Sequence, residues 1–137
     1  MKNKDIQNQR SFNMSRIKSK DTSIELKVRK YLYHNGFRYR KNAQDLPGKP
    51  DIVLYKYKTV IFINGCFWHH HYNCKYASFP KTKKEYWINK INKNVANDYI
   101  NYNKLKMMEY KVIVVWECDI KEAFEYRMKS LVEEILE

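Results

Sequence analysis

The chain has 137 residues, of which 44% are hydrophobic, so it can bury the core of a single domain and is too apolar to be disordered throughout. Twenty-seven Lys and Arg against fifteen Asp and Glu leave a formal net charge of +12, and 15% of the residues are aromatic, which together favour a nucleic-acid partner over a charge that serves solubility alone. No apolar run reaches the roughly 18 residues of a transmembrane helix, and the N-terminus has no secretory segment, so we expect a cytoplasmic protein without a membrane partner.

The N-terminal segment differs from the rest of the chain in charge. Residues 1–20 carry six basic side chains against one acidic side chain, which is typical of a basic arm that orders on nucleic acid. Residues 21–137 are expected to form one domain. This domain begins with Thr22 and Glu25, which have the spacing of a capping box, and apolar residues then recur at helical spacing. The pattern predicts a helix over 23–35, ended by the glycine that follows.

Strand signals come next along the chain. A short strand is expected to begin within residues 37–40, and the prolines and glycine of 46–50 predict a turn. Two short β-branched runs, 51–55 and 59–63, are separated by three residues and therefore predict a hairpin. The segment from 64 to about 80 is expected to be a loop.

Helical signals return after this loop. Thr82 and Glu85 have the spacing of a second capping box, and an apolar stripe after them predicts a long helix to about Met108. The stripe consists of Ile88, Ile91, Val95, Tyr99, Tyr102 and Leu105. Residues 112–116 predict a buried strand, and 123–136 predict a closing helix. The order of elements favours an α/β fold with a mixed β-sheet flanked by helices.

The segment 64–74 holds two thiols, three imidazoles and two large aromatic rings. Thiolate and neutral imidazole are ligands that zinc prefers, and exposed aromatic rings can stack on bases. The chain has three cysteines, Cys66, Cys74 and Cys118, and an odd number argues against a disulfide framework. Three thiolates and one imidazole would complete a closed tetrahedral zinc site. The alternative for the consecutive histidines is a surface that binds metals loosely.

Asp51 follows a proline-containing turn and opens a predicted strand, so its carboxylate is expected at the edge of a sheet. Magnesium takes oxygen ligands, usually one or two carboxylates together with carbonyl groups and water. A Pro-Asp pair before a hairpin therefore indicates nuclease chemistry. Taken alone, however, a solvated turn aspartate is the simpler interpretation.

Other motifs stand around Asp51 in an order that is specific when taken as a whole. They are Asn13-Met14, Asp21-Thr22 with Glu25, 46–51 (LPGKPD), 65–71 (GCFWHHH), Trp87, 93–95 (KNV) with Asp98, and 115–118 (VWEC). From about residue 10 to residue 120 this pattern resembles the very short patch repair (Vsr) DNA mismatch endonucleases, and the string at 65–71 is its most specific part.

The resemblance implies a restriction-endonuclease-like core with a zinc-stabilised loop. It implies a phosphodiester hydrolase that nicks one strand of duplex DNA beside the thymine of a T·G mismatch, the product of 5-methylcytosine deamination. The implied cofactors are Mg2+ for catalysis and Zn2+ for structure. The implied partners are mismatched double-stranded DNA, a cytosine-C5 DNA methyltransferase and mismatch-repair proteins, and we expect a monomer that acts at the nucleoid.

Carried over position by position, the resemblance gives roles to residues of this chain. Asp51 is similar to the carboxylate ligand of the catalytic magnesium, and the backbone carbonyl of Ile63 is similar to its second protein ligand. Glu25 is expected to hold water at the metal. His69 is expected to act as the general base or to orient water, with Asp98 supporting it. An imidazole suits this task because its pKa lies near neutrality.

The same resemblance assigns the zinc to Cys66, His71, Cys74 and Cys118. Four such ligands leave no open coordination position, so this zinc is expected to be structural and not catalytic. It would tie the loop to the end of the last strand. It would also hold the general-base imidazole rigidly beside the magnesium carboxylate.

Phe67, Trp68 and Trp87 resemble aromatic residues that the family inserts into the base stack beside the mismatch. Unstacking a base step costs on the order of a few kcal/mol and less where pairing is weak, which converts mismatch instability into selectivity. Met14 on the basic arm is expected to insert from the other groove. For Trp87 the alternative is burial through the long helix, whereas Phe67 and Trp68, on a polar loop, are expected to be exposed.

Two positions depart from the family pattern. Asn64 stands where the family has a second catalytic histidine, and an amide can orient water but cannot accept a proton as an imidazole does. One extra residue separates His71 from Cys74, a spacing that still suits zinc. Two alternatives therefore stay open: a catalytically weakened or inactive zinc-stabilised protein that binds mismatches or DNA, and a nickase of the same fold with a different sequence specificity.

Overall fold

The computed structural model describes residues 22–137, and the basic arm predicted at 1–20, with Met14, lies outside this range. The elements follow in the order α2 (Ser23–His34), β1 (Arg40–Lys41), β2 (Ile52–Leu54), η1 (Tyr55–Tyr57), β3 (Thr59–Asn64), η2 (Lys75–Ala77), α3 (Lys84–Met107), β4 (Lys111–Trp116), α4 (Glu117–Glu122) and α5 (Phe124–Leu136). The strands form one sheet in the order β1-β2-β3-β4, antiparallel except for the parallel pair β3–β4. The prediction of an α/β fold with a mixed sheet flanked by helices is confirmed.

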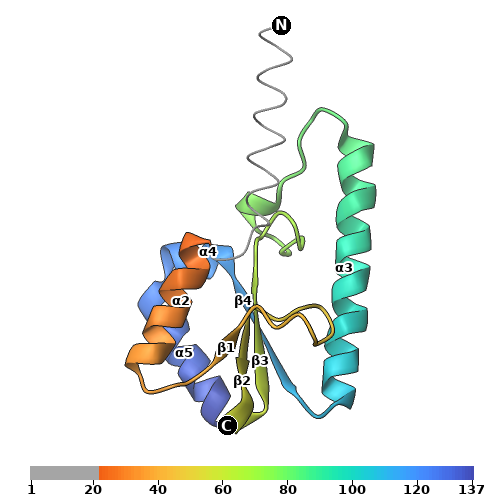
Figure 1. Cartoon of the computed structure of the whole chain (residues 1–137). Helices are drawn as coiled ribbons and strands as arrows, with labels where there is room; N and C mark the ends of the chain where they lie inside the picture. Colours follow the sequence, from red (N-terminus) through yellow and green to blue (C-terminus); the bar gives the residue numbers. More distant parts are fainter. Residues whose placement is uncertain (1–21) are drawn as a thin grey trace, which may run out of the picture.

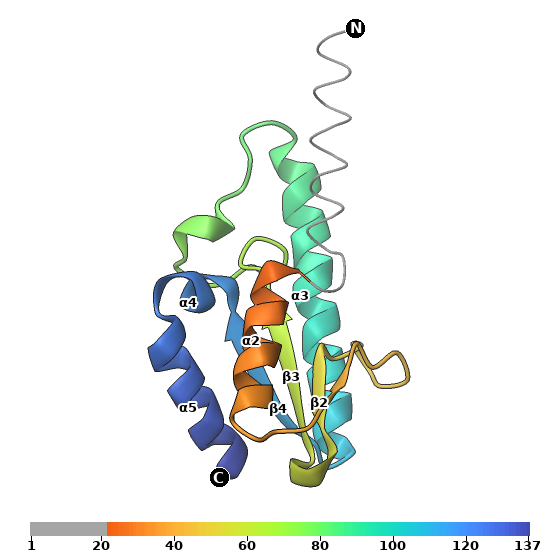
Figure 2. The same ribbon diagram turned by 60° about the vertical axis from the view of Figure 1, so that its left-hand side comes forward.

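The sheet lies between two layers of helices (Figure 1). Helices α2, α4 and α5 cover one face and α3 runs along the other, an arrangement that a view turned by 60° also shows (Figure 2). Successive residues of a strand point to opposite faces, so β3 packs against both layers. Ile61 and Ile63 pack into the core under α2, α4 and α5, whereas Val60 and Phe62 pack into a second, smaller core with Leu105 of α3.

Helix α2 forms where the capping box predicts it. The Thr22 hydroxyl oxygen accepts a hydrogen bond from the Glu25 backbone N–H at 3.4 Å. Val28 and Leu32 are fully buried in the larger core. The chain leaves the helix through Gly36, whose φ of +88° is a left-handed conformation that glycine adopts without strain. The helix therefore presents Glu25 from its first turn on its buried side.

The predicted hairpin is confirmed, and it places Asp51 at a particular edge of the sheet. β2 and β3 pair in antiparallel fashion, and β3 continues in parallel with β4, so that Asn64 lies opposite Trp116 where both strands end. β2 begins at the edge where β3 ends, since the two run in opposite directions. Asp51, the residue before β2, therefore lies where β3 and β4 end and where the long loop begins.

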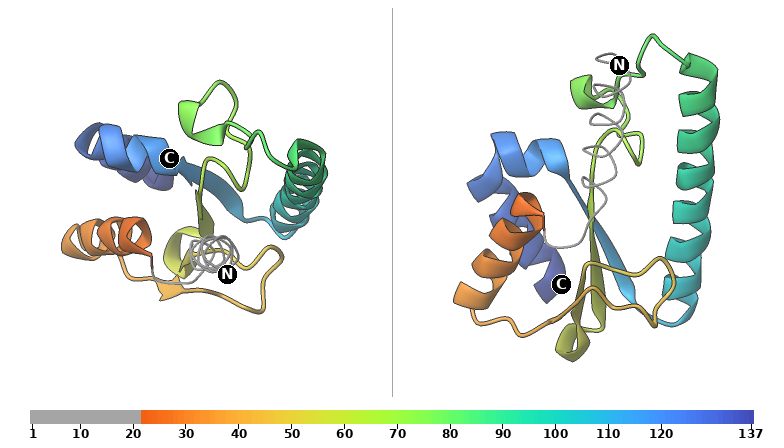
Figure 3. Two further views of the ribbon diagram at one scale, coloured as in Figure 1. Left: turned by 90° about the horizontal axis from the view of Figure 1, so that it is seen from above. Right: turned by 45° about the horizontal axis from the view of Figure 1, so that its top comes forward.

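The start of α3 corrects a prediction. The capping box at Thr82 and Glu85 does not form, because the helix begins after Lys83, which is left-handed and makes no side-chain cap hydrogen bond. Only Ile91 and Leu105 of the predicted apolar stripe are fully buried. The N-terminal half of α3 extends past the end of the sheet (Figures 1 and 3), so most of the stripe has no core to pack against.

Helix α4 is an element that the sequence analysis did not predict. It begins directly after β4 and carries Glu117 and Asp119 in its first turn, where carboxylates stabilise the positive end of the helix dipole. Its six residues make less than two turns, too few for a helical apolar pattern to be recognised. The predicted closing helix is α5. None of the helices within residues 22–137 combines the length and hydrophobicity needed to cross a bilayer.

Candidate active site and metal centre

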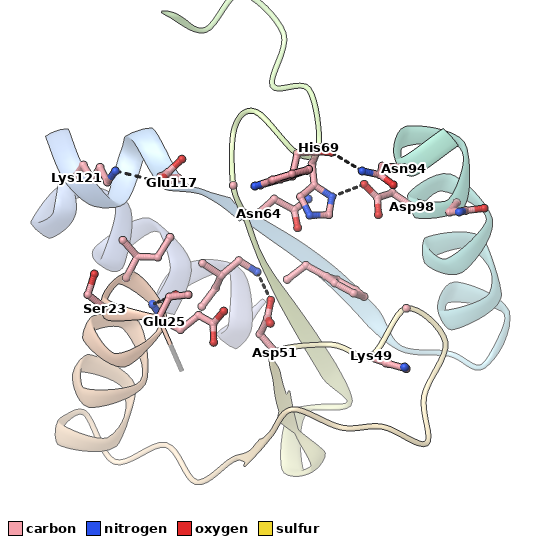
Figure 4. A pocket seen from close by; sticks show the side chains of 18 residues that line it. Ser23, Glu25, Lys49, Asp51, Asn64, His69, Asn94, Asp98, Glu117 and Lys121 are labelled. Atoms are coloured by element: carbon pink, nitrogen blue, oxygen red, sulfur yellow. Dashed lines mark hydrogen bonds and ion pairs between the residues drawn. The ribbon is translucent and has the colours of Figure 1, made fainter. Parts of the chain in front are cut away.

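A cavity of about 480 Å³ lies at the sheet edge where β3 ends. It is formed by α2, the turn before β2, the end of β3, the loop that follows, α3 and α4 (Figure 4). All the residues expected to act in catalysis, and Ile63, line it: Glu25, Asp51, Asn64, His69 and Asp98. The fold thus brings together side chains from five separate segments of the chain.

The Asp51 carboxylate is held against the end of β3. Its Oδ2 accepts a hydrogen bond from the Ile63 backbone N–H at 2.7 Å, and its own backbone N–H donates to the Ile61 carbonyl at 3.1 Å. Burial raises the pKa of Asp51 to about 7, against the lowering effect of the Ile63 hydrogen bond, and the nearby Glu25 carboxylate raises it as well. A solvated turn aspartate is therefore excluded. Two neighbouring, largely buried carboxylates are an arrangement that a divalent cation stabilises.

His69 is fixed by contacts with α3 and with its own loop. Its Nδ1 lies 2.6 Å from Asp98 Oδ2 (Figure 4), and its backbone N–H donates to the Gly65 carbonyl at 3.1 Å. Asn94, one turn before Asp98, donates from its side chain to the Trp68 carbonyl at 3.2 Å. Because Nδ1 is bonded to a carboxylate, Nε2 is the nitrogen left to exchange a proton with a substrate.

Asn64 is buried at the end of β3, with 3% of its surface exposed. Its side-chain Nδ2 donates a hydrogen bond to the Tyr102 hydroxyl on α3 at 2.9 Å. The sequence analysis placed Tyr102 only in the apolar stripe of the long helix. The two residues are 38 positions apart in the sequence, so no local sequence pattern predicts this hydrogen bond.

Charged residues that the sequence analysis did not select also reach the site. Arg29 lies one turn after Glu25 on α2, at 3.7 Å between guanidinium and carboxylate, and the two residues are 3% and 7% exposed. Glu117 accepts a hydrogen bond from the Cys66 backbone N–H at 3.3 Å and pairs with Lys121 at 3.0 Å, and both Glu117 and Lys121 line the cavity. The four-residue spacing of each pair on a helix was the signal available in the sequence.

The four expected zinc ligands form a cluster beside the cavity. The donor atoms of Cys66, His71, Cys74 and Cys118 all lie within 4.8 Å of one another. His71 Nδ1 is 3.6 Å from Cys66 Sγ and 3.3 Å from Cys118 Sγ. A tetrahedral zinc with bonds of about 2.3 Å to sulfur and about 2.0 Å to nitrogen separates such atoms by about 3.6 Å. The donor set is therefore suited to a metal such as zinc, for which it would supply four protein ligands.

The loop around the cluster has a defined backbone. Asn73, directly before Cys74, adopts a φ of +56°, a left-handed conformation that asparagine tolerates better than most residues. The His71 ring stacks on Trp116 with centroids 4.2 Å apart and planes 7° from parallel, which fixes the imidazole on the end of β4. Burial raises the pKa of the Cys66 thiol, so metal binding here is coupled to proton release.

Phe67, Trp68 and Trp87 form an aromatic cluster between the loop and α3. Their ring centroids are 5.1, 5.5 and 5.8 Å apart. Trp68 is only 8% exposed, so the expectation that it would be exposed on a polar loop is wrong, because the loop folds back onto α3 and covers it. Phe67 and Trp87 are partly exposed, and Trp87 packs on the loop and not in either core of the sheet.

Comparisons with known proteins agree with this site. The model of the family described as DNA mismatch endonuclease Vsr matches residues 3–75. The type II nicking enzyme V.NmeAIP of Neisseria meningitidis serogroup A is 50% identical over 128 residues, which are 92% of this chain and 91% of that protein. The DNA mismatch endonuclease Vsr of Escherichia coli K12 is 41% identical over 112 residues, 82% of this chain and 71% of that protein.

A third relative extends the comparison to another bacterium. The type II nicking enzyme V.XorIIP of Xanthomonas oryzae pv. oryzae is 37% identical over 126 residues, covering 90% of this chain and 92% of that protein. The residues that the family model matches include Asp51, His69 and three of the four residues of the cysteine–histidine cluster. The chain belongs to the DNA mismatch endonuclease Vsr family.

Proposed function

We propose that this protein is an endonuclease that nicks one strand of duplex DNA beside the thymine of a T·G mismatch left by 5-methylcytosine deamination. The observation that supports it best is one cavity holding Asp51, Glu25 and the His69–Asp98 pair in a chain of the Vsr family. The printed names of its relatives, a DNA mismatch endonuclease and nicking enzymes, favour the same activity.

Magnesium is the ion that the oxygen donors of this cavity suit best, with the Asp51 carboxylate and the Ile63 carbonyl as its protein ligands. When bound, it supplies charge stabilisation at the phosphodiester. Glu25 would hold water at the metal from the first turn of α2, and the Arg29 guanidinium would keep that carboxylate in place from one turn further on. The protein would thus order water around the metal before any bond changes.

His69 is proposed to accept the proton of the attacking water at Nε2. Its Nδ1 faces the Asp98 carboxylate at 2.6 Å, which fixes the ring and stabilises the imidazolium that forms. A general base placed in this way contributes roughly 10²- to 10⁴-fold in rate. Asn64 contributes by hydrogen bonding only, because an amide cannot take the proton.

The aromatic cluster is proposed to enter the base stack at the mismatch. Phe67 and Trp87 form its exposed side, and Trp68 lies behind them and stiffens the wedge. The energy of unstacking is lower at a weak pair, which favours insertion at a mismatch. Met14, on the arm outside the described residues, is proposed to insert from the other groove.

Phosphate contacts are proposed for the part of α3 that extends past the sheet and for the loop before it. Five lysines lie there, all at least partly exposed: Lys81, Lys83, Lys84, Lys90 and Lys93. With the basic arm at 1–20 they supply the counter-charge that DNA binding needs. We further propose that residues 21–137 act as one endonuclease domain, as a monomer at the nucleoid. A cytosine-C5 DNA methyltransferase and mismatch-repair proteins would be its functional partners.

The zinc proposed at Cys66, His71, Cys74 and Cys118 is structural. It joins the loop that carries His69 to the start of α4, close to where β3 and β4 end. Because all four positions are protein ligands, no position remains for substrate.

The test is nicking of a T·G duplex by the purified protein with magnesium. The expected result is a single nick with wild type and none with Asp51→Ala, which removes a metal ligand and leaves the zinc cluster intact. Asn64 is the observation that favours the second candidate, a protein that binds mismatches without cutting them. Mismatch binding with no cleavage above the Asp51→Ala control would select that candidate. Cleavage in several sequence contexts would show whether the specificity differs from the one proposed.

A further inference from the structure

The side chain of Asn64 is held by one defined hydrogen bond. It lines the cavity at the end of β3, and its Nδ2 donates to the Tyr102 hydroxyl at 2.9 Å. No other side-chain hydrogen bond of Asn64 occurs within residues 22–137. An amide presents its donor and its acceptor on opposite sides. With the nitrogen directed at α3, the Oδ1 acceptor is therefore the end left for the cavity.

Tyr102 is itself rigidly placed. Its ring packs against Phe62 of the smaller core with centroids 4.9 Å apart. Burial raises the pKa of Tyr102 to about 12, so the hydroxyl stays neutral at any working pH. The carboxylates of Asp98 and Asp51 raise this pKa as well. The phenol oxygen accepts the hydrogen bond from Nδ2, so the nitrogen of the amide and not its oxygen is directed at α3.

We propose that Tyr102 is a positioning residue, which locks the Asn64 amide so that Oδ1 accepts a hydrogen bond from the water that attacks the phosphodiester. This inference rests on the proposed function and adds a residue to it. The pair supplies the orientation that an imidazole would supply at position 64, without its capacity to take a proton. His69 remains the proton acceptor, and Figure 4 shows Asn64 and His69 on the same side of the cavity.

The experiment compares single-turnover nicking of a T·G duplex, with magnesium and excess protein, for wild type, Tyr102→Phe, Asn64→Ala and the double variant. Tyr102→Phe keeps the ring against Phe62 and removes only the hydroxyl. It is expected to lower the rate constant about 5- to 10-fold, the value of one buried hydrogen bond, with unchanged duplex affinity and melting temperature. In the Asn64→Ala background the same change is expected to have no further effect.

Two controls separate positioning from general damage. Tyr99→Phe makes the same chemical change on the same helix at a residue that is 68% exposed, and it is expected to nick as wild type does. In the magnesium-free protein, the Asn64 side-chain amide signals in a nitrogen–proton NMR spectrum are expected to shift in Tyr102→Phe and to stay in place in Tyr99→Phe.

A wild-type rate for Tyr102→Phe would overturn the inference, and so would an equal loss with and without Asn64. Unmoved Asn64 amide signals would overturn it too. If wild type itself does not nick the duplex, the proposed function fails and this inference falls with it. If wild type nicks the duplex and Tyr102→Phe nicks it at the same rate, the inference is refuted and the proposed function stands.

Discussion

At the scale of single residues, the environment of Asp51 has a direct consequence for stability. Its pKa is raised by burial from an ordinary 3.8 to about 7, so the folded protein binds the proton more tightly than the unfolded chain. The resulting stabilisation is complete below pH 3.8 and is lost as the pH rises through about 7. Above that pH the buried charge lowers the free energy of unfolding by up to about 4 kcal/mol.

Asp51→Asn is therefore expected to raise the free energy of unfolding of the magnesium-free protein by a few kcal/mol at pH 8. Near pH 4 the substitution is expected to change that free energy little. The asparagine Oδ1 can still accept the hydrogen bond from the Ile63 N–H. Denaturant unfolding at the two pH values measures this difference. Magnesium is expected to narrow the gap at pH 8 by stabilising wild type only. Equal free energies of unfolding of the two proteins at pH 8 without magnesium would show that the charged Asp51 carboxylate does not destabilise the fold.

Asn64→His is expected to raise the single-turnover nicking rate roughly tenfold, because the imidazole introduces a proton acceptor at the position where the resemblance places a second catalytic histidine. The Tyr102 hydroxyl is available to hydrogen-bond the new ring. Asn64→Gln is the control, since it changes the length of the side chain and adds no base. An unchanged or lower rate for Asn64→His would reject a role for a second imidazole at this position.

Some residues of the candidate site could be predicted from the sequence and others could not. Asp51, Glu25, His69 and Asp98 were found because they sit inside family motifs of recognisable order. Arg29 and Tyr102 were not, since a basic residue on a helix and an aromatic residue in an apolar stripe have ordinary structural explanations. Their roles depend on which side chains face them across the fold, and a linear pattern does not encode that.

At the scale of elements, the loop after β3 is expected to depend on the proposed zinc. Its segments are irregular, with His70 and Asn73 in left-handed conformations, and four donor atoms lie within 4.8 Å of one another. A zinc bound there would stabilise a stretch that hydrogen bonds alone do not make regular. Because His69 lies on this loop, its position relative to Asp51 depends on the same cluster.

Elemental analysis of the magnesium-free protein is expected to give about one zinc per chain. Cys118→Ser is expected to lose most of that zinc, to lower the melting temperature and to reduce nicking. His70→Ala is a matched control, because His70 neighbours the ligand His71 and stacks on Phe79 instead of joining the cluster. Zinc content in Cys118→Ser equal to that of wild type would refute the four-ligand assignment.

The observed boundaries of the helices and strands show which local sequence signals were sufficient to predict an element. The predicted N-cap at Thr22 forms because the chain enters α2 in an extended conformation, whereas the one predicted at Thr82 does not form because the chain enters α3 through the left-handed Lys83. The hairpin followed from β-branched runs alone. The long helix was found from its apolar stripe, yet only Ile91 and Leu105 of that stripe are fully buried, because the length of α3 exceeds that of the sheet beside it.

At the scale of the whole molecule, the site is a consequence of topology. The parallel pair β3–β4 ends at one edge, the antiparallel β2 starts there, and α2 and α3 flank that edge from opposite faces. Glu25 comes from α2, Asp51 from the turn before β2, His69 from the loop after β3 and Asp98 from α3. The same edge carries the cysteine–histidine cluster and the aromatic cluster, so cleavage and mismatch recognition are proposed to occur side by side.

The most direct test of this account uses a T·G duplex whose two strands carry different labels, incubated with magnesium and wild-type protein. The account predicts one nick, in the strand that contains the mismatched thymine, with the other strand and a matched T·A duplex left intact. Asp51→Ala is expected to leave both duplexes uncut. Cleavage of both strands, equal cleavage of the matched duplex, or nicking that persists in Asp51→Ala would contradict it.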